Sequence, residues 1–107
     1  MSTVSHSQVL SMAGLVDFQQ GAIVSRVIVK GETGNVTLFA FDQNQELSEH
    51  TAPFDSLVHV IEGEIEIKIS SQPYRLESGE AILMPAGKPH ALKAVARSKM
   101  LLTMLHA

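Results

Sequence analysis

Five histidines and no cysteine limit the metal chemistry that this chain can carry. Without thiolates, a transition-metal site must be built from imidazole and carboxylate ligands, a set that suits iron, manganese, nickel or zinc. His50 and His90 are the candidate metal ligands, because each stands at a junction between an expected strand and a loop. Glu49 and Asp55 flank His50 and are the candidate carboxylate ligands. Two histidines and one carboxylate would form a facial triad with open positions.

His90 ends the most distinctive stretch of the chain, residues 79–90, which reads GEAILMPAGKPH. Residues 81–84 suit a buried strand. The following Pro85 and Gly87 favour a turn, because proline restricts φ and glycine permits positive φ. We therefore expect Gly87 to have a positive φ, and we expect the turn to form a rigid corner that directs the His90 side chain.

The rest of the chain predicts short strands separated by turns. Alternation is clearest in residues 64–69, EIEIKI, whose isoleucines should face a core while the charged residues face water. Residues 9–18 lack a clean period and suit either a short edge strand or one helical turn. The other strands are expected at residues 22–30, 36–41, 46–50, 56–61, 74–76, 81–84, 91–95 and 99–106. This succession of short strands predicts an all-β sandwich or barrel.

A chain of 107 residues should form a single domain. We expect residues 1–21 to be an N-terminal arm or edge segment and residues 22–107 to be the barrel domain. Two expected strands, 36–41 and 99–106, are apolar on both faces, whereas a small barrel has only one interior. This pattern predicts a homodimer that buries the outer face of one sheet.

Composition excludes several classes of partner. The formal net charge of −3 argues against nucleic acid, which requires a basic surface. No run of 18 apolar residues is present, so no membrane-spanning helix and no membrane partner are expected. The N-terminus lacks the basic and apolar regions of a secretory signal, and no disulfide can form. A cytoplasmic location is therefore expected.

Two stretches carry a resemblance to a known family. Residues 79–90 match Gly-x5-Pro-x-Gly-x2-His at every position, and so resemble the second signature motif of the cupins. Residues 50–63, HTAPFDSLVHVIEG, resemble the first cupin motif, His-x-His-x3-Glu-x6-Gly. The resemblance extends over about residues 22–105. It implies a single-domain cupin jelly-roll β-barrel of the small cupin 2 type, a group that usually dimerises and often holds one divalent metal.

The first motif departs from the family pattern. When it is anchored on Gly63, His50 takes the first histidine position, Ala52 the second and Ser56 the glutamate position. A longer spacing variant would instead place Glu49 and Thr51 at the two histidine positions. Outside these ligands, Asn44 stands where the family has a glycine before the first histidine, and Ala94 stands at the final asparagine of the second motif. Of the four metal positions that the resemblance implies, His50 and His90 are therefore the two that keep a strong ligand.

Two functions of different classes follow from these residues. The first is a small cupin that binds a small molecule in the barrel, with a divalent metal (iron, manganese, nickel or zinc) held by the two histidines. Strand parity turns Ser56, Val58 and Val60 toward the interior, so these are the candidate pocket residues, whereas His59 should face outward. The alternative is a metal-dependent enzyme of the dioxygenase or isomerase type that acts on a small polar molecule. The complete second motif favours the enzyme, and the missing ligands of the first motif favour the binding protein. His6 and His106 have no expected role.

Overall fold

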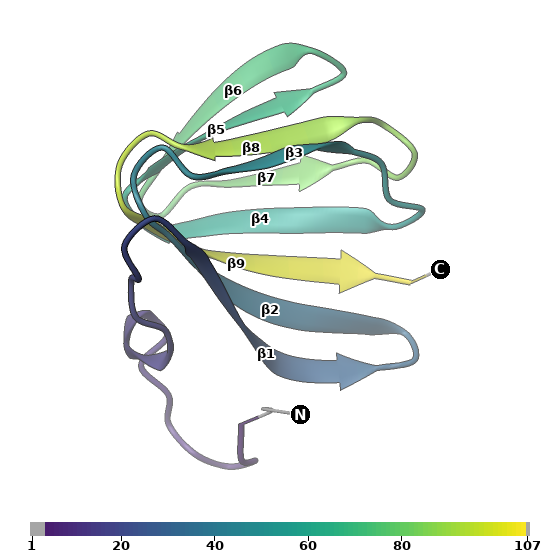
Figure 1. Cartoon of the computed structure of the whole chain (residues 1–107). Coiled ribbons are helices and arrows are strands. Elements are labelled where there is room, and N and C mark those ends of the chain that lie inside the picture. Colours follow the sequence, from purple (N-terminus) through teal and green to yellow (C-terminus); the bar gives the residue numbers. More distant parts are fainter. Residues whose placement is uncertain (1–3, 107) are drawn as a thin grey trace.

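A computed structural model describes residues 4–106 and shows nine strands in two antiparallel sheets (Figure 1). The five-stranded sheet has the order β1-β2-β9-β4-β7, and the four-stranded sheet has the order β3-β8-β5-β6. The strands are β1 (Ile23–Gly31), β2 (Gly34–Phe41), β3 (Glu46–His50), β4 (Asp55–Glu62), β5 (Glu64–Ile69), β6 (Gln72–Glu77), β7 (Ala81–Met84), β8 (His90–Ala94) and β9 (Ser98–Leu105). The all-β jelly-roll prediction is confirmed, and every expected strand is present with ends shifted by at most two residues.

The core lies between the two sheets and is built from alternate residues of each strand. Ile65 and Ile67 of β5 are fully buried, as the EIEIKI alternation predicts, and they pack with Phe41, Val58 and Met100 from the other sheet. Lys68 points to solvent. Figure 1 shows strands β3, β8, β5 and β6 in the upper half of the view and β1 and β2 at its lower edge. Burial of this shared interior is the main source of stability in a domain of this size.

Residues 13–18, which we call the N-terminal segment, pack on the outer face of the five-stranded sheet. Val16 is buried with Leu38 and Ala40 of β2, and Phe18 packs against the same cluster. The segment contains a single turn of 3₁₀ helix, Ala13–Leu15, which is one of the two conformations expected for residues 9–18. It lies at the lower left of Figure 1, beside β1.

This packing changes one argument from the sequence. The second apolar face of β2 was expected to need a partner chain, but the chain's own N-terminal segment covers Leu38 and Ala40. The argument was wrong for that part of β2, because residues 9–18 showed no period that would place them on a sheet. Dimerisation itself stays a prediction. Between residues 4 and 106 the structure contains no helix long and apolar enough to cross a membrane.

Candidate functional site

His90 is positioned by the corner that its sequence predicts. Gly87 has φ +77°, in the left-handed region that glycine adopts without strain. The Gly87 N–H donates a hydrogen bond of 2.8 Å to the carbonyl of Ala52, so the corner is tied to the loop before β4. The chain then enters β8 at His90, which is buried, with only 5% of its surface exposed.

His50 reaches the same place through an irregularity in β3. Leu47 packs against the core, so strict alternation would turn His50 to the outer face of the sheet. The pairing of β3 with β8 shifts between Leu47 and His50, and this shift sets His50 directly opposite His90. We call this end of the barrel, where β3 finishes and β8 begins, the histidine end.

The two imidazole rings meet through their Nε2 atoms, which lie 3.0 Å apart. The ring centroids are 4.3 Å apart and the planes are inclined by 71°. His50 is exposed while His90 is buried, so solvent reaches the pair from the His50 side. The structure thus brings together two residues that are forty positions apart in the chain.

The other nitrogen of each ring faces a main-chain carbonyl. His50 Nδ1 lies 2.8 Å from the carbonyl oxygen of Ser48, and His90 Nδ1 lies 3.3 Å from that of Lys88. A carbonyl oxygen only accepts, so these contacts favour the tautomer with the proton on Nδ1 in both rings. In a neutral imidazole the proton is on one nitrogen alone, so two rings with the proton on Nδ1 would bring two unprotonated Nε2 atoms together. A cation between them, either a proton or a metal ion, would satisfy both.

Burial lowers the pKa of His90 below its usual value of 6.5, and the neighbouring charge of His50 lowers it further. The bond from Nδ1 to the Lys88 carbonyl acts in the opposite direction and is the smallest of the three effects. His90 is therefore neutral at neutral pH, which is the form that binds a metal ion.

The geometry of the pair fits a shared metal ion. Imidazole nitrogens bound to one tetrahedral zinc ion are each about 2.0–2.1 Å from the metal, which puts them about 3.3 Å apart. The two Nε2 atoms are 3.0 Å apart, so they would separate slightly around an ion that lies to one side of the line between them. The bonds at Nδ1 also match the usual support of a metal-binding histidine, in which the second nitrogen donates to an oxygen.

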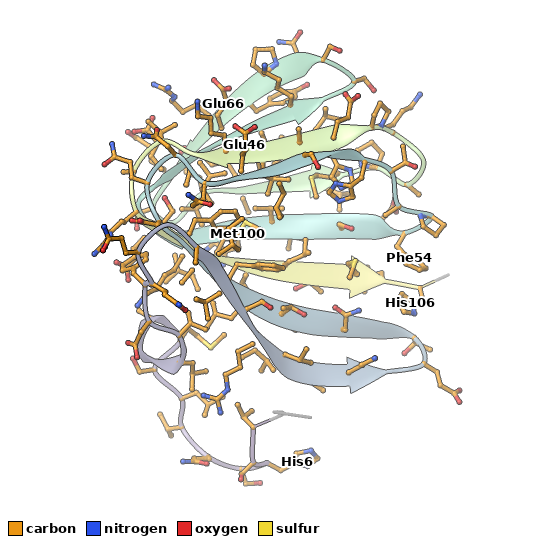
Figure 2. All side chains as sticks on the ribbon, viewed as in Figure 1. His6, Glu46, Phe54, Glu66, Met100 and His106 are labelled. Atoms are coloured by element: carbon orange, nitrogen blue, oxygen red, sulfur yellow. The ribbon has the colours of Figure 1, made fainter. Side chains whose placement is uncertain are left out.

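The candidate carboxylates do not join the pair. Asp55 accepts a hydrogen bond of 2.9 Å from the main-chain N–H of Ala86 through Oδ1. Glu49 lines a hollow on the outer face of the four-stranded sheet, together with Glu46 and Glu66, which Figure 2 labels on the upper side of the molecule. Within residues 4–106, no three histidine or acidic side chains lie close enough to hold one metal ion. The facial triad expected from the sequence is therefore absent from the described chain.

The candidate pocket residues all face the interior, at different depths. Val58 and Val60 are fully buried members of the core, between the two sheets. Ser56 lies one inward position closer to the histidine end, where it pairs with Met84 and Met104 of the neighbouring strands. Their contact with a ligand stays a prediction, and only Ser56 stands near the exposed end of the barrel. His59 is exposed on the outer face, as expected from strand parity.

Sequence reasoning missed two features of this end. The carbonyls of Ser48 and Lys88 select the tautomers of the two histidines, but a main-chain acceptor has no signature in sequence. The second missed feature is the packing of His106 against Phe54: the two rings stack with centroids 4.1 Å apart (Figure 2). The Nδ1 atom of His106 also lies 3.0 Å from the carbonyl oxygen of Glu32. No local pattern links Phe54 to His106, because only the barrel brings the loop before β4 beside the end of β9.

Comparison with known proteins identifies the family. The family model described as "Cupin domain" matches residues 37–106. A conserved protein of unknown function from Streptococcus pyogenes is 36% identical, with a TM-score of 0.92, and the match covers 100% of this chain and 96% of that one. A cupin superfamily protein from Desulfitobacterium hafniense is 25% identical, with a TM-score of 0.91 and coverage of 97% and 95%.

A third solved structure, a cupin 2 conserved barrel domain protein from Leptotrichia buccalis, is 34% identical with a TM-score of 0.84. That match covers 87% of this chain and 45% of the other. No curated protein matches the chain. The family model spans more than half of the sequence and the fold agrees along the whole chain, so this protein belongs to the cupin family.

Proposed function

We propose that this cupin binds a small molecule at the histidine end of the barrel, through a divalent metal ion held by His50 and His90. One observation carries the proposal: the two Nε2 atoms lie 3.0 Å apart while both Nδ1 atoms face carbonyl oxygens. Two unprotonated nitrogens at that distance repel each other, and either a shared proton or a metal ion bound to both would remove the repulsion; we propose the metal ion.

Each histidine contributes differently. His90 is buried and held by the corner at Gly87, so it provides a rigid ligand whose lowered pKa keeps it unprotonated. His50 is exposed, so the open side of the ion would face solvent and an incoming molecule. A metal ion held there would act as a Lewis acid and orient an oxygen-containing ligand. By register, Ser56 of β4 and Asn35 of β2 are inward polar positions of the opposite sheet on either side of Met104.

Metal binding by matched variants tests this proposal. The purified protein, stripped with a chelator, is titrated with iron, manganese, nickel and zinc, and bound metal is measured by elemental analysis. We expect one ion per chain for at least one metal, and its loss in the His50→Ala/His90→Ala double variant. His59→Ala is the control, because His59 is exposed on the other sheet and should leave binding unchanged. A wild-type protein that binds none of the four metals would contradict the metal site.

We also propose a homodimer, formed through the part of the five-stranded sheet that the N-terminal segment leaves uncovered.

A further inference from the structure

Arg26 places a positive charge on an apolar surface outside the barrel. In β1 it stands between Val24 and Ile28, which pack in the cluster that the N-terminal segment covers on the outer face of the five-stranded sheet. Its neighbour across the strands is Leu38, a fully buried member of that cluster. This surface lies apart from the histidine end, so binding here would not depend on the proposed metal site.

No carboxylate of the described residues neutralises this charge. The other two cations beside the N-terminal segment are Arg97 and Lys99. Arg97 pairs with Asp42 at 2.8 Å, and Lys99 Nζ lies 3.8 Å from a carboxylate oxygen of Glu62. Along the described chain, no such pair forms at Arg26 within 4.0 Å. A half-buried charge without a counter-ion is unfavourable, so the position favours an anion from outside the chain.

Most hydrogen-bond donors of the Arg26 guanidinium are also unused. Nη1 donates one long hydrogen bond, of 3.3 Å, to the carbonyl of Leu15. Nε is buried and has no acceptor, a state that no other side-chain nitrogen or oxygen of residues 4–106 shares. A guanidinium carries five N–H groups in a planar fork that matches a carboxylate. Because Nε is closed off from solvent, a ligand would meet this fork at the two Nη atoms.

A hollow of about 470 Å³ lies beside Arg26, between the N-terminal segment and β1. A volume of this size suits a small ligand. The apolar lining includes Leu15, Phe18 and Val24, and Gln19 contributes an amide. The hollow therefore combines a cation with hydrocarbon walls, which is the complement of a carboxylate on an apolar body.

The exposed side chain of Asp17 also lines the hollow and limits the charge of the ligand. Arg26 can neutralise one negative charge, whereas a second negative charge would be repelled by the Asp17 carboxylate. We propose that this hollow binds a small monocarboxylate with an apolar chain or ring, whose carboxylate accepts hydrogen bonds from the Nη atoms of Arg26. The apolar body of the ligand lies against the N-terminal segment.

NMR spectroscopy of the full chain labelled with ¹⁵N tests this site, because the buried Nε–H of Arg26 should give its own side-chain signal. The protein is titrated at neutral pH and constant ionic strength with hexanoate, hexan-1-ol or inorganic phosphate. We expect hexanoate to shift this signal and the main-chain signals of Phe18 and Val24 along one saturable curve. Hexan-1-ol should bind at least about tenfold more weakly, because it lacks the charge-assisted hydrogen bonds. Phosphate should cause no saturable shift.

Variants of the two charged residues give opposite effects. Arg26→Met keeps an unbranched side chain and removes the charge, so hexanoate binding should be lost while the melting temperature is kept or raised. Arg26→Lys keeps the charge without the planar fork and should bind several-fold more weakly. Asp17→Asn should bind about two- to fivefold more tightly, because the repulsion is removed. Lys30→Met is the control, since Lys30 is an exposed cation of the same strand and should leave binding unchanged.

Three results would overturn the proposal. Equal binding of hexanoate and hexan-1-ol would show an apolar hollow that does not recognise the carboxylate. Unchanged hexanoate affinity in Arg26→Lys and Asp17→Asn would place binding elsewhere, even if Arg26→Met failed to fold. A wild-type protein without a saturable shift in hexanoate, or one that prefers phosphate, would contradict a monocarboxylate site.

Discussion

At the scale of single residues, this chain keeps the backbone conformations of the cupin motifs but has few of their metal-binding side chains. Gly63, Gly79 and Gly87 all have positive φ. Asn44, at a position where the family has glycine, also has a positive φ of +69°, which asparagine tolerates better than most residues. The positive φ angles of these turns are thus retained, although Ala52 offers no metal ligand and Ser56 only a weak one.

Two of these glycines should differ in their tolerance of a side chain. A Cβ at Gly63 would overlap the carbonyl oxygen of Arg97 and the side chain of Ser98, whereas a Cβ at Gly87 meets open space. Gly63→Ala combines an unfavourable φ with this overlap, so we expect a loss of about 3 kcal/mol in the free energy of unfolding. Gly87→Ala should lose only about 1 kcal/mol, from φ alone. Urea denaturation of both variants measures the difference, and equal losses would contradict the role of close packing at Gly63.

At the scale of elements, lysine and arginine side chains of the sheet hold the N-terminal segment in place through hydrogen bonds and cation–π contacts. Lys99 donates a hydrogen bond from Nζ to the carbonyl of Ala13, and Arg26 donates one of 3.3 Å from Nη1 to that of Leu15. Arg97 and Lys99 also lie over the ring of Phe18, at 5.3 and 4.9 Å from its centroid. These contacts hold a segment with almost no regular structure of its own on the outer face of β2 and β9.

Removal of the Phe18 ring should therefore weaken the whole domain. Phe18→Ala loses both cation–π contacts and part of the apolar cluster around Val16, and we expect about 2–3 kcal/mol less stability. Val9→Ala is the matched control, because Val9 is 99% exposed and its truncation should change stability by less than about 0.5 kcal/mol. Chemical denaturation measures both. An unchanged midpoint for Phe18→Ala would mean that the segment does not support the sheet.

The carboxylate of Asp42 makes the stability of the same region depend on pH. The main-chain N–H of Gly21 and the side chain of Arg97 both donate to its carboxylate and lower its pKa from 3.8 to about 2. Since the pKa is lower in the folded state, the carboxylate stabilises the fold fully above pH 3.8. This contribution is lost as the pH falls to about 2.

We therefore expect Asp42→Asn to be less stable than the wild type at neutral pH, and the difference between them to shrink as the pH falls from about 4 to 2. Urea denaturation at a series of pH values provides the measurement. A difference that stays constant down to pH 2 would show that the Gly21 and Arg97 contacts do not favour the charged form.

On the surface of the molecule that residues 4–106 form, part of the five-stranded sheet is uncovered and apolar. We call this surface the outer patch: in adjacent strands it contains Val29, Val36, Thr103, Leu57 and Leu83, with Leu105 beside them. Leu57 and Leu83 are 41% and 58% exposed. Contiguous apolar surface of this kind commonly marks an interface, and a twofold dimer is the simplest closed assembly that would cover it.

Light scattering tests the dimer. We expect the wild type at micromolar concentration to have twice the mass of one chain, and Leu57→Lys/Leu83→Lys to have the mass of a monomer, because a charge in a buried apolar interface is strongly unfavourable. Tyr74→Lys is the control, since Tyr74 is also 41% exposed but belongs to the four-stranded sheet. A wild-type protein that is monomeric would contradict the prediction, and a dimer that survives the double substitution would place the interface elsewhere.

The order of the amino acids was enough to predict the strands, the turns and the family, because these depend on local chemistry. Alternation in residues 64–69 defined an inward face, and Pro85 with Gly87 restricted the backbone before His90. Both features act between neighbours in the chain, so no tertiary contact was needed to predict them.

The surroundings of the histidines and the cover of the sheet depend on long-range contacts that the sequence did not predict. The pairing shift between Leu47 and His50 turns His50 inward, and the carbonyls of Ser48 and Lys88 lie beside the two Nδ1 atoms, where they favour a proton. Asp55 accepts a hydrogen bond from the main-chain N–H of Ala86, in another loop, and the expected triad is not assembled among the described residues. These outcomes depend on contacts between segments far apart in sequence and on main-chain groups that every residue carries, and neither leaves a pattern in the order of side chains.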